Sequence, residues 1–388
     1  MRVVVNAIAA ESGGALTILR SFHSYVRNNL APEDEWIFLL GSPHFGSDGR
    51  VRSLFVNRAK LSRSARLLFD FFSGRRLLAA LRPDVVFSLQ NTLLRGAPCP
   101  QVLYVHQALP FQRYRRFSLL RRRERNVAIS QHLIGLLIKR SVRLADHVVV
   151  QTKWMRDAIV AQTGISATEI SVLQPDLERV ERSRSRPERD PQLFFYPTAD
   201  LPYKNLECIY QAVTRLSSFT PGNFRVLLTI DGPAGLPGIT HVGRISREDV
   251  LRIMQNSTLV YPSYVESYGL PLAEGRSLGA LILAADCSYA REVLAGYPDA
   301  HFFDPFCPDN LADLMHSVLA GVIKPRGQPE SATEDSSQRV STWKAVVDIL
   351  REVETRRAPP VHRPGDPRHR FRLGAPADRM HPEPRRRR

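Results

Sequence analysis

The sequence has few cysteines, no long apolar run and too few acidic residues to balance the basic ones. Its cysteines, Cys99, Cys208, Cys287 and Cys307, form no C-x-x-C pair. Their scatter argues against a disulfide framework and a zinc site, and it fits a reducing cytoplasm. The longest apolar run, at 133–138, falls far short of the roughly 20 residues that span a bilayer. We therefore expect a cytoplasmic protein, soluble or peripheral at the inner face of the plasma membrane, whose chain begins with a strand and not a signal peptide.

The shortage of acids gives a net charge of +16 over 388 residues, and two segments hold most of the excess. Residues 356–388 contain eleven arginines and three acids, and the segment Arg113–Arg125 contains seven arginines and one acid. A basic segment suits an anionic surface. Aromatic and leucine side chains lie between the arginines of Arg113–Arg125, which favours a membrane surface. We predict an anionic membrane as its partner, and no specific nucleic acid.

Short apolar runs alternate with helical patterns in both halves of the chain. The first half has strand-like runs at 3–9, 36–40, 84–89, 102–105 and 147–151. The second half has such runs at 193–197, 225–232, 258–263 and 281–285, with helical patterns at 205–216, 247–257 and 271–280. Continuous apolar runs suit strands that are buried on both faces. The alternation implies parallel sheets with crossover helices, and therefore an α/β protein.

The length and one polar stretch predict two domains. A chain of 388 residues is too long for one ordinary core. The charged stretch at 179–192 has no apolar periodicity and reads as a linker. It would separate an N-terminal domain at 1–178 from a C-terminal domain at 193–330. An amphipathic helix ends the segment 331–357, and the basic tail at 358–388, poor in apolar residues, is expected to be disordered.

The stretch VESYGLPLAE at 265–274 places Glu266 and Glu274 on either side of a Gly-Leu-Pro sequence. It joins a predicted strand to a helix that begins near Pro271, where open α/β sheets bind ligands. Gly269 lets the backbone pass close to a ligand, and free amides at a helix start favour a phosphate. Carboxylates accept hydrogen bonds from sugar hydroxyls. The stretch therefore indicates a nucleotide-sugar site.

These residues carry a family resemblance. The run VYPSYVESYGLPLAEGRSLGA resembles the E-x7-E segment of the retaining glycosyltransferases of family four. The matching positions are Pro262, Ser263, Glu266, Gly269, Leu270, Pro271, Glu274 and Gly279. The runs at 242–260, 288–296, 302–305 and 342–350 are similar to other family segments, and NAIAAESGGALTILRSF resembles the glycine loop of surface-polysaccharide enzymes. The resemblance covers the chain up to residue 355 or so.

The resemblance implies a fold and an activity. The fold is GT-B, in which two Rossmann-like domains face each other across a cleft and the helix of 331–357 crosses back onto the N-terminal domain. The implied activity is retaining transfer of a sugar from a nucleoside-diphosphate sugar to an acceptor, which we expect to be a lipid-linked saccharide. The pathway expected is surface polysaccharide biosynthesis, either capsule or lipopolysaccharide.

The resemblance also implies roles for particular residues. Glu274 would hold the ribose hydroxyls of the donor, and Glu266 would contact the donor sugar near its reacting face. Lys204 would pair with the diphosphate, whose charge grows as it leaves. His106 would face the donor sugar across the cleft. We therefore list Glu266, His106 and Lys204 as catalytic.

The remaining donor-binding residues are mostly backbone contacts. The amides around Gly269 and Leu270 would touch sugar and phosphate. Gly13 and Gly14, in a loop on the acceptor side of the cleft, are counted with them.

One departure from the family concerns the diphosphate. Thr198 and Ala199 stand where the family usually has Gly and Arg, so a second cation is missing there. Arg244 is the candidate replacement. No Asp-x-Asp follows a predicted strand, and the family group needs no metal, so we expect no metal and no cofactor.

Alternatives stay open at this point. A nucleotide-sugar epimerase could use the same scaffold, but a basic membrane segment would have no purpose in it. A nucleic-acid-binding protein would explain the arginines, but not the E-x7-E segment, and it should lose affinity steeply with salt. Thr198 and Ala199 also allow a non-catalytic member of the family.

Overall fold

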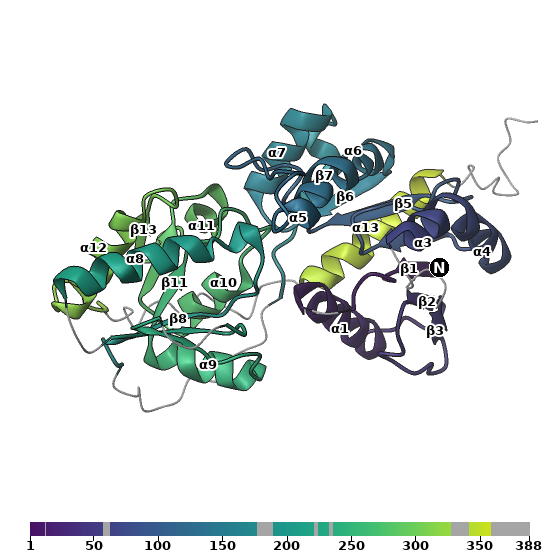
Figure 1. Cartoon of the computed structure of the whole chain (residues 1–388). Coiled ribbons are helices and arrows are strands. Elements are labelled where there is room, and N and C mark those ends of the chain that lie inside the picture. Colours follow the sequence, from purple (N-terminus) through teal and green to yellow (C-terminus); the bar gives the residue numbers. More distant parts are fainter. Residues whose placement is uncertain are drawn as a thin grey trace, which may run out of the picture.

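The computed structural model describes residues 1–11, 13–56, 63–176, 189–220, 224–232, 236–326 and 341–357. Figure 1 shows two α/β bodies side by side, and each contains one parallel sheet. The predicted α/β class with two Rossmann-like units is confirmed. Most of the predicted linker at 179–192 and all of the predicted tail at 358–388 lie outside the described residues.

The first body has a seven-stranded sheet in the order β3-β2-β1-β4-β5-β6-β7. The strands are β1 (Arg2–Asn6), β2 (Glu35–Leu40), β3 (Val51–Phe55), β4 (Val85–Ser88), β5 (Gln101–Val105), β6 (His147–Val150) and β7 (Ile170–Val172). The helices are α1 (Gly13–Asn28), α3 (Arg63–Leu68), η1 (Phe69–Ser73), α4 (Gly74–Leu81), α5 (Arg125–Ile129), η2 (Ser130–Ile134), α6 (Gly135–Leu144), α7 (Lys153–Thr163) and η3 (Ala167–Glu169). Val4 of the inner strand β1 pairs with Ile37 and Val86, and all three side chains are buried. Burial on both faces explains the continuous apolar runs.

The second body has a six-stranded sheet in the order β10-β9-β8-β11-β12-β13. The strands are β8 (Leu193–Tyr196), β9 (Arg225–Leu228), β10 (Ile239–His241), β11 (Thr258–Tyr261), β12 (Ile282–Ala285) and β13 (Ala300–Phe303). The helices are η4 (Pro202–Lys204), α8 (Leu206–Phe219), α9 (Arg247–Asn256), α10 (Leu270–Ser277), α11 (Ser288–Val293) and α12 (Pro308–Leu319). No helix in the described part of the chain is long and apolar enough to cross a membrane.

The last described helix, α13 (Thr342–Arg357), follows the second body in sequence but packs on the first (Figure 1). Its buried Trp343 lies 4.9 Å from Phe22 between ring centroids, and the indole Nε1 donates a hydrogen bond to Ser21 Oγ at 2.8 Å. Arg351 pairs with the buried Asp34 at 3.1 Å. The helix therefore completes the core beneath α1.

Side-chain contacts brace the two bodies beside this crossing. The Glu292 carboxylate of α11 accepts hydrogen bonds from the backbone N–H groups of Lys153 and Trp154, at 2.7 and 2.9 Å. It satisfies two of the donors that the start of α7 leaves free. Thr152 Oγ1 donates to the Ser267 carbonyl at 2.8 Å. These contacts set how the loop after β6 meets the loop after β11.

Trp343→Ala should destabilise the protein by about 3–5 kcal/mol, because it removes a buried ring and leaves a cavity. Lys344→Ala is the matched control. The Lys344 side chain is exposed, so its removal should change the free energy of unfolding little. Chemical denaturation of both variants measures the difference. Equal midpoints for Trp343→Ala and the control would show that α13 does not belong to the core of the first body.

Candidate active site

A cavity of about 460 Å³ lies between the two bodies. Most of its lining residues follow β1, β5 and β6 of the first sheet and β8 and β11 of the second, and the strand order reverses between β1 and β4 and between β8 and β11. Loops diverge at such points and leave a crevice beyond the strand ends. Of the residues predicted from the sequence, those that line the cavity are Gly14, His106, Lys204, Glu266, Gly269, Leu270 and Glu274.

The E-x7-E segment turns sharply from β11 into α10. Gly269 stands just before the helix with φ +83°, a conformation that other residues adopt at a cost. A Cβ at this position would lie 3.4 Å from the Tyr289 ring, an ordinary van der Waals contact, so the positive φ and not a lack of space favours glycine here. Glu274 follows in the helix, and its side chain is only 6% exposed. The carboxylate Oε1 lies 2.8 Å from Nη1 of Arg247, the first residue of α9.

The second carboxylate of the segment is also paired with a cation. Lys204 Nζ donates to Glu266 Oε1 at 2.6 Å, and both side chains are largely buried. Asn205, with φ +55°, fixes the turn after Lys204 because its amide donates to the carbonyls of Pro262 and Pro305. The cavity thus holds two carboxylate–cation pairs. A diphosphate could replace the carboxylates as partner of the cations, and sugar hydroxyls could replace the cations as partners of the carboxylates.

His106 is held by an asparagine on the neighbouring strand end. The Asn91 Oδ1 accepts the backbone N–H groups of His106 and Gln107, at 2.7 and 2.8 Å. This fixes the amide orientation, so Asn91 Nδ2 is the donor toward His106 Nε2 at 3.2 Å. The proton of the neutral imidazole then sits on Nδ1, which is buried and has no partner among the described residues. Burial, and next the charge of Arg66, lower the pKa of His106 to about 4.

Two predicted residues lie elsewhere. Gly13 begins α1 with φ +59° but does not line the cavity, whereas a Cβ on Gly14 would lie 3.9 Å from Leu270 across it. Arg244 is exposed in the loop after β10 and does not line the cavity either. Arg247, three residues later, does line it. The sequence does not reveal which arginine points inward, because that depends on the turn between β10 and α9.

The departure at Thr198 and Ala199 is visible in the structure. The Thr198 N–H donates to Thr229 Oγ1 at 2.7 Å, and that hydroxyl donates back to the Thr198 carbonyl at 2.9 Å. Ala199 is exposed, and neither residue lines the cavity. Within the described ranges, no group of three or more His, Cys, Asp or Glu side chains could hold a metal ion.

Two family matches agree with this architecture, which is that of a glycosyltransferase with the GT-B fold. Residues 31–175 match Glycosyltransferase Family 4, and residues 234–334 match Glycosyl transferases group 1. The chain belongs to the family-four glycosyltransferases. This assignment decides against the epimerase and the nucleic-acid-binding protein. No curated protein sequence matches the chain.

Solved structures show the same fold at low sequence identity. The lipopolysaccharide outer core galactosyltransferase WaaB, in its apo form, is 18% identical with a TM-score of 0.54, over 84% of this chain and 92% of its own. WaaG, a glycosyltransferase involved in lipopolysaccharide biosynthesis, is 13% identical with a TM-score of 0.64, over 90% and 99%. Anabaena HepE in complex with UDP-glucose is 13% identical with a TM-score of 0.56, over 92% and 98%.

The lowered pKa of His106 predicts a pH dependence of stability. In the unfolded chain His106 is protonated below its ordinary pKa of 6.5, whereas in the folded protein it stays neutral down to about pH 4. The contribution of His106 to stability should therefore fall by about 2 kcal/mol between pH 7 and pH 5. Denaturation of the wild type and of His106→Gln at both pH values tests this. Parallel pH curves for the two proteins would contradict a neutral, buried imidazole.

Proposed function

We propose that the cavity is the donor site and that its residues divide the donor between them. Glu274 accepts hydrogen bonds from the ribose hydroxyls, and Lys204 binds the diphosphate. Glu266 and His106 contact the donor sugar, Glu266 from the second body and His106 from the first. The observation that carries this proposal is the convergence of two carboxylate–cation pairs and the His106 imidazole on one interdomain cavity.

Each group can act without a conventional general base. The negative charge on the leaving diphosphate grows in the transition state, and the fixed Lys204 ammonium stabilises it there more than in the ground state. When Lys204 pairs with the diphosphate instead, the Glu266 carboxylate can accept a hydrogen bond from a sugar hydroxyl or stabilise positive charge at the anomeric carbon. The neutral His106 contacts the donor sugar. The bond between the anomeric carbon and the phosphate oxygen breaks, the acceptor oxygen bonds to that carbon, and the departing phosphate takes the proton of the acceptor hydroxyl.

Arg247 supplies the second diphosphate cation in this proposal. It lines the cavity from the start of α9 and reaches Glu274 at 2.8 Å. Its side chain is 42% exposed, so its guanidinium can turn toward a ligand without leaving a buried gap. It therefore takes the role considered for Arg244, and it compensates for Ala199 in place of the family arginine.

Arg247→Ala should weaken nucleoside-diphosphate binding about tenfold, because a charge-assisted hydrogen bond to phosphate is lost. Arg244→Ala is the matched control and should bind like the wild type. The measurement is the thermal shift with UDP, GDP and dTDP. A ligand at about 100 times its Kd adds roughly 2.7 kcal/mol to the free energy of unfolding. The nucleotide that stabilises the wild type also identifies the base. If both variants lose nucleotide affinity equally, or if neither loses any, the role of Arg247 is contradicted.

The acceptor in this proposal is a lipid-linked saccharide at an anionic membrane, in surface polysaccharide assembly. WaaB and WaaG, which share the fold, are both described as lipopolysaccharide enzymes. On this chain, most arginines of Arg113–Arg125 are exposed, and Leu120 among them is 90% exposed. Arg115 is the exception, because it donates to Tyr264 across the bodies and to the buried Glu124.

Arg122→Gln combined with Arg123→Gln should weaken binding to phosphatidylglycerol vesicles roughly tenfold or more, since each basic residue near such a surface contributes about 1 kcal/mol. Arg75→Gln with Arg76→Gln removes the same charge from α4 and serves as the control. Co-sedimentation with vesicles measures both. If the wild type does not bind anionic vesicles, or if both pairs lose binding equally, the membrane assignment of Arg113–Arg125 is wrong.

A further inference from the structure

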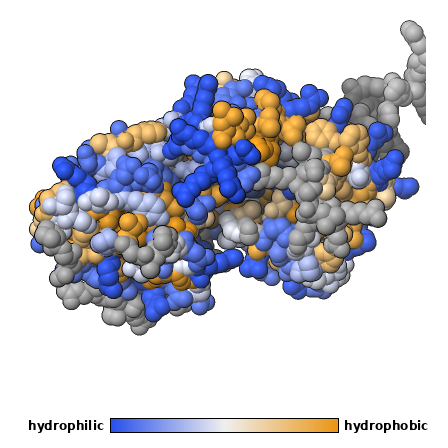
Figure 2. All heavy atoms as spheres, viewed as in Figure 1, coloured by the Kyte–Doolittle hydropathy of each residue, from blue (hydrophilic) through white to orange (hydrophobic). Residues whose placement is uncertain are grey.

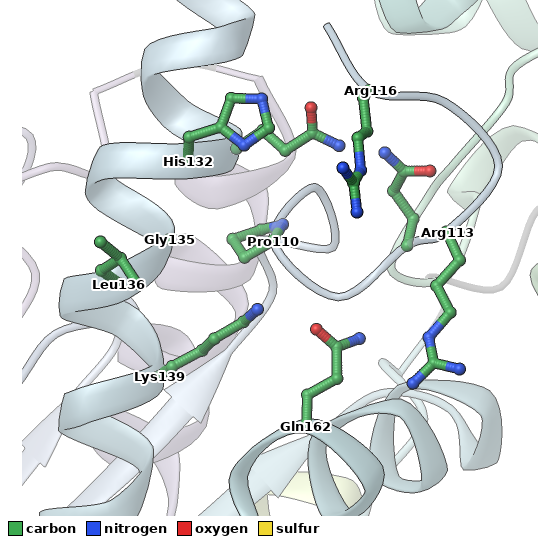
Figure 3. A pocket seen from close by; sticks show the side chains of 10 residues that line it. Pro110, Arg113, Arg116, His132, Gly135, Leu136, Lys139 and Gln162 are labelled. Atoms are coloured by element: carbon green, nitrogen blue, oxygen red, sulfur yellow. The ribbon is translucent and has the colours of Figure 1, made fainter.

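The first body contains a second cavity, of about 580 Å³, that shares no lining residue with the donor cavity. It lies between the segment that follows β5, the helical run η2–α6 and the end of α7. Figure 3 shows Lys139 reaching into this space from α6, Arg116 from the loop above and Gln162 from α7, with Arg113 at the rim. No acidic residue lines it.

Three cations in this cavity have no counter-charge in the part of the chain that the structure describes. Arg113, Arg116 and Lys139 form no ion pair there. The one acid of the basic segment, Glu124, is already paired with Arg115 and Arg121. Burial, and then the charges of Arg143 and Arg113, lower the pKa of Lys139. An anion that entered would therefore relieve repulsion between like charges.

The walls of the cavity are held in place without a ligand. Gln112 and Gln131 both donate to the Arg115 carbonyl, and Gln112 Oε1 accepts the Arg115 N–H at 3.0 Å. A Cβ on Gly135 would lie 3.0 Å from Pro110, so α6 packs closely against the loop. These contacts fix the backbone that carries Arg113 and Arg116, and binding would cost little ordering of it.

The rim is apolar on the side of α6. Leu136, which lines the cavity from α6, is 66% exposed, and Leu133 of the preceding η2, outside the lining, is 56% exposed. Figure 2 shows hydrophobic surface over the region of α6 bordering strongly hydrophilic surface over the region of α5. A cationic cavity with leucines at its edge suits a ligand that is both anionic and amphiphilic.

We propose that this cavity binds a phosphoryl group, as a phosphate monoester or diester. Two arginines and a lysine can each donate to phosphate oxygens, and guanidinium groups match them with paired hydrogen bonds. The group could come from a phospholipid headgroup or from a soluble phosphate, and the two sources share this chemistry. The inference deepens the membrane part of the proposed function and does not depend on the donor site.

The test compares Lys139→Gln with Arg140→Gln. These neighbours on α6 carry the same charge, but Arg140 is exposed and does not line the cavity. One arm titrates glycerol 3-phosphate calorimetrically. The other measures co-sedimentation with phosphatidylglycerol vesicles and with vesicles whose equal surface charge comes from oleic acid. Thermal melts confirm that both variants fold. Any binding of phosphate at the donor cavity is common to both variants and drops out of the comparison.

Lys139→Gln should weaken binding about tenfold in at least one arm, while Arg140→Gln should change it less than about twofold. If the two variants differ in binding glycerol 3-phosphate, a soluble phosphate is enough to occupy the cavity. If the two variants differ only in binding phosphatidylglycerol vesicles, and not oleic acid vesicles, the ligand is a lipid headgroup. Equal behaviour of the two variants in both arms overturns the proposal, even if the wild type binds vesicles and the membrane assignment stands.

Discussion

The contact between Lys204 and Glu266, at 2.6 Å, depends on the strand order of the second sheet, and the proposed donor site depends on that contact. Lys204 follows β8 and Glu266 follows β11, the two central strands between which the order reverses. The first sheet reverses between β1 and β4. The loop after β1 there leads to Gly14, and the loop after β4 carries Asn91, which holds His106. Parallel topology thus brings both crevices to one cavity, with carboxylates and cations on one wall and a neutral imidazole on the other.

The charges of the cavity are balanced before any donor enters. Glu274 is almost fully buried, and an unpaired carboxylate there would be costly, so Arg247 stabilises the empty site. In the proposed function, a donor brings a diphosphate that can pair with both cations and hydroxyls that can donate to both carboxylates, so no charge is left without a partner when the donor binds. The Glu292 carboxylate of α11 joins the second body to the start of α7 in the first.

The sequence predicted the centre of each sheet better than its edges. The runs that became β1, β2, β4, β5, β8, β11 and β12 are continuous and apolar because neighbouring strands and helices bury them on both faces. The strands β3, β7, β10 and β13 were not predicted, and all four are edge strands. One side of an edge strand faces solvent, so a run such as VRSLF in β3 carries no clear apolar signal. In the same way, the E-x7-E segment and Lys204 could be found from local pattern, whereas Arg247 could not. Its inward orientation depends on where β10 ends and α9 begins, which local sequence does not fix.

The central claim is that Glu274 holds the ribose while Lys204 holds the diphosphate. The most direct measurement compares the affinities of the nucleoside diphosphate and the corresponding monophosphate for the wild type, Lys204→Ala and Glu274→Gln, by calorimetry. The account predicts that Lys204→Ala removes much of the preference for the diphosphate, because one of the two cations assigned to the diphosphate is lost. It predicts that Glu274→Gln weakens both ligands by a similar factor, because both contain the ribose. If Lys204→Ala keeps the preference, or if Glu274→Gln changes the preference alone, the roles assigned to the two residues are wrong.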